Sequence, residues 1–199
     1  MEITVKVLTR SVLLSGAIAL AFGCNDRQAS PTALLTPSFS QNNGGGKHGF
    51  GFNGNASGFP TGAVSLTGGG AYDVSTASNT VPSVTFVHSG GGFGCTAAVA
   101  QGPLAGCATG EGVRWDTAQL LASTTFKCTG ADAAKHAATN DETVVLLADF
   151  YRAGDGINES FTAQMIVSQT DLAPDIPGVQ NLWVQGVGCG SAIAHFSNN

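Results

Sequence analysis

Residues 144–168 read VVLLADFYRAGDGINESFTAQMIVS, which is two apolar segments on either side of a polar turn. Val144–Tyr151 has the pattern of a continuous apolar strand. Residues 161–167 alternate between apolar and polar side chains, which is the period of a strand with one buried face. Asp155-Gly156 between them is a strong hairpin signal. The segment therefore predicts two strands joined by a tight turn.

The same period of two recurs along the chain, whereas helical periodicity does not. Apolar residues alternate at 50–52, 64–66, 84–88 and 113–115, and a last apolar segment spans 182–189 and 193–196. The helical candidates are short, at Thr117–Leu121 and Ala131–Ala138. Seven or eight strands at this spacing predict an all-β fold with one or two short helices, namely a single disulfide-stapled β-sandwich or a closed β-barrel.

Three glycine triplets interrupt the pattern, starting at Gly44, Gly68 and Gly90. The chain has 28 glycines, about twice the average frequency. Because glycine in a strand permits a bulge or a sharp coil, we interpret the triplets as bulges whose exposed backbone is covered by a nearby aromatic ring.

Four of the five cysteines lie after residue 90, at Cys95, Cys107, Cys128 and Cys189. None shows the Cys-x-x-Cys spacing of a zinc or redox motif. Cys95 and Cys107 bracket a loop that contains Gly102-Pro103, so pairing them is the local solution. We therefore predict the disulfides Cys95–Cys107 and Cys128–Cys189.

The N-terminal residues predict export. Lys6 and Arg10 precede an apolar run, Ser11–Ala21, whose eleven residues would reach about 16 Å as a helix, half of a bilayer core. A basic segment followed by a short apolar one is typical of a signal peptide, here residues 1–23. Two cleavage sites remain open: Ala19-Leu20-Ala21 fits ordinary signal peptidase, whereas Ala21-Phe22-Gly23-Cys24 resembles the bacterial lipobox, in which the cysteine becomes the lipidated first residue.

Two observations favour lipidation of Cys24. It leaves an even number of cysteines in an oxidising compartment. Residues 24–46 are also rich in polar residues and glycine, and are suited to tether the domain formed by residues 47–199. The chain is in these respects similar to bacterial envelope lipoproteins with one disulfide-stapled β-domain. We expect an outer-membrane or cell-surface lipoprotein, with a secreted or periplasmic protein as the alternative.

The charge pattern limits the partners. Eight basic and thirteen acidic residues give a net charge of −5, and no basic cluster is present. This argues against nucleic acid and against electrostatic binding to anionic lipid. We expect contact with the membrane through the lipid anchor alone, and a protein or small-molecule partner that the sequence does not identify.

The candidate ligand pocket consists of Trp115, Trp183, His88 and His195. The tryptophans are core anchors or one wall of an apolar pocket. The two histidines lie at predicted strand ends, where they serve as half-buried core residues or meet in space. No two histidines have the spacing of a metal site, and we expect no cofactor.

No catalytic motif is present. Ser191 lacks the strand–turn–helix context of a nucleophile elbow. Asp155, Asn158 and Glu159 are weak calcium candidates, because their spacing does not match an EF-hand loop, and a solvated turn is the simpler interpretation. The expected function is a non-catalytic binding or structural role, with a small apolar-ligand carrier as the alternative and a secreted hydrolase as the third hypothesis.

Overall fold

The computed structural model of the protein describes residues 46–58, 61–131, 133–152 and 160–198. The predicted signal peptide, the predicted lipidation site Cys24 and all but the last residue of the predicted tether lie outside the described residues. Within these ranges, no helix has the length and hydrophobicity needed to cross a bilayer.

Strands are the dominant regular structure of the described residues and the helical part is limited to two single 3-10 turns, which confirms the all-β prediction. The strands are β1 (Lys47–Gly58), β2 (Ala63–Asp73), β3 (Val87–Ala97), β4 (Arg114–Leu121), β5 (Ser123–Phe126), β6 (Lys135–Ala138), β7 (Thr143–Tyr151), β8 (Ser160–Ser168), β9 (Leu182–Val184), β10 (Gly188–Gly190) and β11 (Ala192–Asn198).

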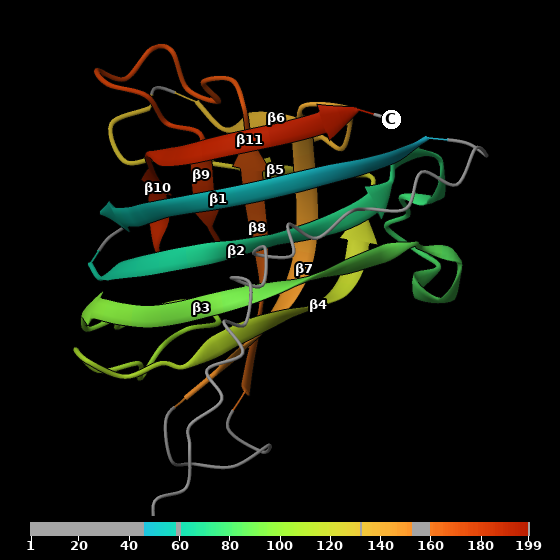
Figure 1. Ribbon diagram of the computed structural model, residues 1–199. Helices are drawn as coiled ribbons and strands as arrows, with labels where there is room; N and C mark the ends of the chain where they lie inside the picture. Colours follow the sequence, from blue (N-terminus) through green and yellow to red (C-terminus); the bar gives the residue numbers. More distant parts are fainter. Residues whose placement is uncertain (1–45, 59–60, 132, 153–159, 199) are drawn as a thin grey trace, which may run out of the picture. The chain divides into compact units, whose positions relative to one another are not determined.

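One antiparallel sheet closes on itself. Its strand order is β10-β9-β8-β7-β4-β3-β2-β1-β11, and β1 also pairs with β10. β10 and β11 are separated by Ser191 alone and pair with successive parts of β1, so the closing strand is one bent segment. Figure 1 shows β1, β2 and β3 running across β7 and β8. Of the two predicted architectures, the hydrogen bonding matches the barrel.

Both predicted helices are wrong. Thr117–Leu121 belongs to β4 and pairs with β7, and Ala131–Ala138 ends in β6, which pairs with β5. Short apolar segments take the conformation that their neighbours impose, and here sheet pairing overrides local propensity. The helical residues observed are single 3-10 turns at Val74–Thr76 and Pro82–Val84.

The glycine triplets of β2 and β3 face one another across the two strands. Gly68 pairs with Gly91 and Gly69 with Gly90 in continuous register, so the predicted bulges are absent there. The one register shift between β2 and β3 lies at Ala63/Val64. A Cβ atom at Gly91 would overlap the backbone of Thr67 and Gly68, which shows that the strands approach more closely than side chains allow.

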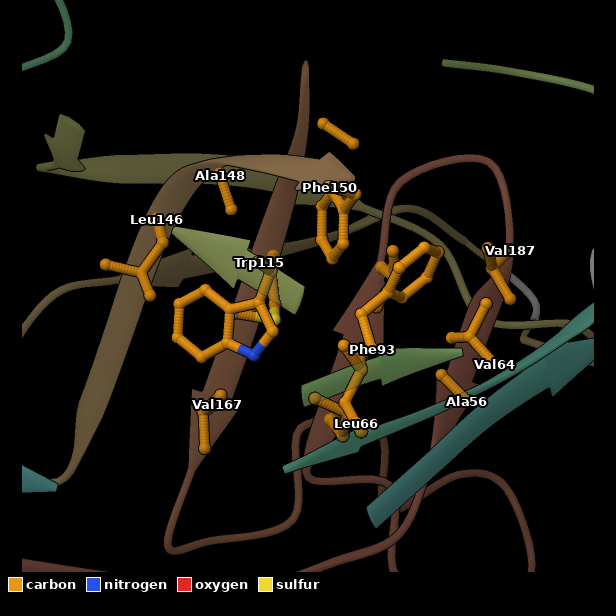
Figure 2. Close-up of a cluster of buried hydrophobic side chains, with 14 of the residues drawn as sticks. Ala56, Val64, Leu66, Phe93, Trp115, Leu146, Ala148, Phe150, Val167 and Val187 are labelled. Atoms are coloured by element: carbon orange, nitrogen blue, oxygen red, sulfur yellow. The ribbon is translucent and has the colours of Figure 1, made fainter. Parts of the chain in front are cut away.

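Side chains fill the interior of the barrel. Trp115, Tyr72 and Phe150 are fully buried, and Trp115 lies at the centre of the cluster drawn in Figure 2. Its indole nitrogen donates a hydrogen bond to the Thr67 carbonyl at 3.0 Å, next to the paired glycines. Covering of the glycine backbone by a ring is therefore observed. An eight-stranded closed sheet is just wide enough to be filled in this way.

A second apolar cluster lies on the outside of β7, β8 and β9. Val145, Ile166 and Trp183 face outward there and are covered by Phe126 of the β5–β6 hairpin and by Ala173. On β7, Val144 and Val145 are both fully buried although they point to opposite faces. The strand is consequently covered on both sides, which accounts for its continuous apolar sequence.

Both predicted disulfides are present. Cys95–Cys107 closes the loop after β3 with a Cα–Cα distance of 6.2 Å. Cys128–Cys189 joins the end of the β5–β6 layer to β10 with a Cα–Cα distance of 5.1 Å. Two disulfides indicate an oxidising, non-cytoplasmic compartment.

Candidate binding pocket

The four residues proposed from the sequence as a pocket do not come together. Trp115 is enclosed in the barrel interior, whereas Trp183 belongs to the outer cluster. His88 and His195 are exposed on the outer face of the glycine-rich strands. His88 lies on β3 and His195 on β11, with β1 and β2 between them, so they are about 14 Å apart across the sheet.

Of these four residues, Trp183 lines a pocket. The pocket has a volume of about 460 Å³ and opens to solvent at the border of the β5–β6 layer. Trp183 and Phe126 contribute aromatic rings to its base, with ring centroids 5.8 Å apart. The polar side chains around them are Gln101, Gln164, Gln185, Thr125 and Lys127, and the remaining lining residues are Gly102, Ala134, Gly186 and Gly188.

One wall of the pocket is a contact between two loops. The Gln101 Nε2 atom donates hydrogen bonds to the carbonyl oxygens of Gly186 at 2.5 Å and Thr61 at 2.6 Å. Gly102 and Gly186 have φ of +69° and +83°, and a Cβ atom on Gly102 would lie 2.6 Å from the Gly186 Cα. Only glycine fits both the left-handed conformation and this close approach. Cys95 and Cys107 flank the loop that contains Gln101, and their disulfide ties the two ends of this loop together.

Two further glutamines line the pocket, Gln164 of β8 and Gln185 of the turn that follows β9. The backbone N–H of Gln164 donates to Gln185 Oε1 at 3.0 Å, and Gln164 Oε1 accepts from the Thr124 hydroxyl. These bonds fix both side-chain oxygens. The Nε2 groups of Gln164 and Gln185 have no hydrogen-bond partner within the described part of the chain. Each is therefore available as a donor at the pocket.

The described lining residues hold no carboxylate, imidazole, serine or thiol. A hydrolase of the usual kinds needs a general acid or base, or an activated nucleophile. Two carboxylates do meet elsewhere: Asp116 and Asp149 are partners across β4 and β7. Each has a local partner, Arg114 at 3.2 Å and the Thr162 hydroxyl at 2.6 Å, and neither lines the pocket.

A polar cluster not predicted from the sequence lies where β1 and β2 meet the 140–142 turn. His48 Nε2 is 3.4 Å from Asp141 Oδ1, and the Tyr72 hydroxyl donates to the Asn140 carbonyl at 2.7 Å. Burial raises the pKa of Tyr72, and the nearby Asp141 charge raises it further. The phenol therefore keeps its proton and its hydrogen bond at neutral pH, which is a structural role.

No metal site is evident in the described ranges, since no group of three or more histidine, cysteine, aspartate or glutamate residues is close enough to hold an ion. The weak calcium candidates Asp155, Asn158 and Glu159 lie outside the described residues.

Sequence reasoning missed most of the pocket. Gln101, Gln164 and Gln185 come from three separate regions, and glutamine has no spacing signature that marks a ligand site. The one available signal was Trp183, an aromatic residue in a segment that also carries polar and glycine residues.

Comparisons with protein-family models, with curated proteins and with solved structures each gave no match.

Proposed function

We propose that this chain is an exported, lipid-anchored protein of the bacterial cell envelope whose barrel domain binds a small ligand without catalysis. The observation that carries the proposal is the pocket over Trp183 and Phe126. A concave site of a few hundred Å³ with an apolar base and a few placed polar groups is the common form of a small-molecule site.

The composition of the pocket favours binding over chemistry. Amides and a threonine hydroxyl form hydrogen bonds but are poor acids, bases and nucleophiles at neutral pH. The barrel interior, where a carrier would hold an apolar ligand, is instead occupied by large buried side chains such as Trp115 and Phe150. The external pocket is thus the site that the geometry favours.

Fragment screening tests this function. A library of neutral fragments is added to the exported chain, and binding is followed by saturation-transfer NMR. Hits should compete with one another and should weaken in Trp183→Phe. Hits that bind the variant and the parent equally well would place binding elsewhere and would contradict the proposal.

The lipid anchor has its own test. Cys24→Ser should move the chain from the membrane fraction to the soluble exported fraction, and the intact mass of the parent should include lipid on Cys24. A variant that stays in the membrane as tightly as the parent would refute the anchor and leave the pocket untouched.

A further inference from the structure

We infer that the pocket over Trp183 receives an uncharged sugar ring, presented alone or at the end of a glycan. The inference rests on the proposed binding function and adds the chemical class of the ligand. A sugar ring has a face of C–H groups and an edge of hydroxyl groups. The pocket offers a matching surface to each.

The base of the pocket matches the C–H face. Trp183 and Phe126 are only 7% and 3% exposed, so the outer cluster holds their rings in place and a small, fixed apolar area of them reaches the pocket. The Cys128–Cys189 disulfide belongs to the same cluster and helps to fix both rings. A pre-formed surface costs little entropy when a ligand binds. Because the exposed area is small, we expect a single sugar ring to bind weakly.

The polar side chains match the hydroxyl edge. A sugar hydroxyl oxygen accepts hydrogen bonds, and the N–H groups of an amide side chain donate them. Gln164 and Gln185 direct their oxygens into bonds within the protein and keep their Nε2 donors free. Thr125, exposed at the same pocket, adds a hydroxyl. An apolar ligand would instead remove water from these groups without replacing its hydrogen bonds, which is unfavourable.

The charges favour a neutral ligand. Lys127 is the one charged residue among the described lining residues, and it is exposed. A single solvated lysine attracts an anion only weakly. The chain has a net charge of −5, which disfavours anions further. A cation has no carboxylate to meet in the described lining.

The volume of the pocket and its opening to solvent limit the size of the part of the ligand that it can enclose. A volume of about 460 Å³ accommodates one ring, and the opening to solvent leaves room for the rest of a longer chain. Ligand efficiency for a molecule of this size gives a dissociation constant of about 1 to 10 mM for a monosaccharide.

Titration of the exported chain with methyl β-glucoside, methyl β-galactoside and N-acetylglucosamine tests the inference. Saturation-transfer NMR measures binding, and tryptophan fluorescence locates it, because Trp115 is fully buried in the barrel and Trp183 lies at the pocket. At least one sugar should bind saturably and change the fluorescence of the parent. The fluorescence response should vanish in Trp183→Phe.

Matched glutamine variants then separate a pocket contact from a general effect. Gln185→Ala removes a pocket donor and should raise the dissociation constant about fivefold, the value of one hydrogen bond. Gln169→Ala removes an exposed glutamine outside the pocket and should leave the constant unchanged. Near-ultraviolet circular dichroism checks that each variant is folded. If Gln185→Ala is not folded, Trp183→Phe supplies the pocket variant.

The outcomes distinguish the ligand class from the function. If no sugar binds up to about 100 mM but the neutral apolar probe N-phenyl-1-naphthylamine binds and is lost in Trp183→Phe, the sugar inference is overturned and the binding function stands. If neither binds, both are overturned. Sugar binding that is equal in the parent and in every pocket variant also overturns the inference.

Discussion

The two halves of the barrel bury their strands differently. The glycine-rich half, β1 to β3, packs one face on the interior and leaves the other open, so that Val64 is buried and its neighbour Ser65 is not. The half formed by β7, β8 and β9 is covered on its outer face as well, by the β5–β6 hairpin and the segment after β8.

The difference shows how the pocket arises. The outer face of β1 to β3 carries glycine and small polar residues and has no covering layer, and a hollow of about 520 Å³ lies at its border with β11, lined by residues that include Asn53 and Ile193. A covering layer on the other half ends at Phe126 and Ala134, and the step between this layer and the sheet forms the pocket. The ligand site is therefore a consequence of covering one half of a barrel that is otherwise closed and full.

The largest expected effect concerns the two disulfides. Paired substitution Cys128→Ala/Cys189→Ala releases the covering layer from β10 and should lower the free energy of unfolding by about 4 kcal/mol. The Cys95–Cys107 disulfide closes a shorter loop. On the chain-entropy model, Cys95→Ala/Cys107→Ala should therefore lower the free energy of unfolding by about 3 kcal/mol. Urea denaturation of both variants measures the difference. A greater loss from the Cys95–Cys107 pair would show that the covering layer holds without its disulfide.

The next effect concerns the glycines that distinguish the open half. Gly91→Ala places a methyl group against the backbone of Thr67 and Gly68 and should cost about 3 kcal/mol through overpacking. Gly94→Ala is the matched control on the same strand, since the nearest atom to its Cβ is the Glu111 carbonyl oxygen at 3.8 Å. Its stability should stay within about 0.5 kcal/mol of the parent. Equal melting temperatures for the two variants would contradict the close approach of β2 and β3.

The smallest effect tests the double burial of β7 directly. Val144 and Val145 face opposite sides of one strand, and both side chains are fully buried. Val144→Ala and Val145→Ala should therefore each lower the free energy of unfolding by about 2 kcal/mol. On β2 the neighbour of buried Val64 is Ser65, and Ser65→Ala should cost less than about 0.5 kcal/mol. Thermal unfolding of the three variants gives the comparison. A neutral Val145→Ala would mean that the outer cluster contributes no stability.

The fold class and the Cys95–Cys107 pair could be predicted because both depend on local patterns, and Cys128–Cys189 is then the pair that remains. Alternation at Phe50 and Phe52 or at Val64 and Leu66 reports which face is buried, and the Cys95–Cys107 loop is short enough to suggest its own closure. The helix predicted at Thr117–Leu121 failed for a physical reason: Leu120 and Leu121 are both buried, on opposite faces of β4, and adjacent buried leucines do not distinguish a strand from a helix.

The pocket could not be predicted because it depends on which strands become neighbours. Trp115 and Trp183 look alike in the sequence, yet one packs against paired glycines inside the barrel and the other faces outward beside Phe126. Gln164 and Gln185 meet only because Met165 pairs with Val184, a long-range register that no local pattern encodes. The contact between His48 and Asp141 could not be predicted for the same reason, because it too depends on which segments become neighbours in the fold.

The double pairing of β1 has a kinetic consequence. β1 pairs with β2 directly after it, but its other edge is completed only by β10 and β11, where His48 meets Asn198. Contacts between the two ends of a domain give a high contact order, and such domains fold slowly. The edge of β1 therefore stays unpaired until the last strands of the domain have formed. An unpaired strand edge is a template for pairing with another chain, so a partly folded molecule is exposed to association until its own C-terminal strands close the barrel.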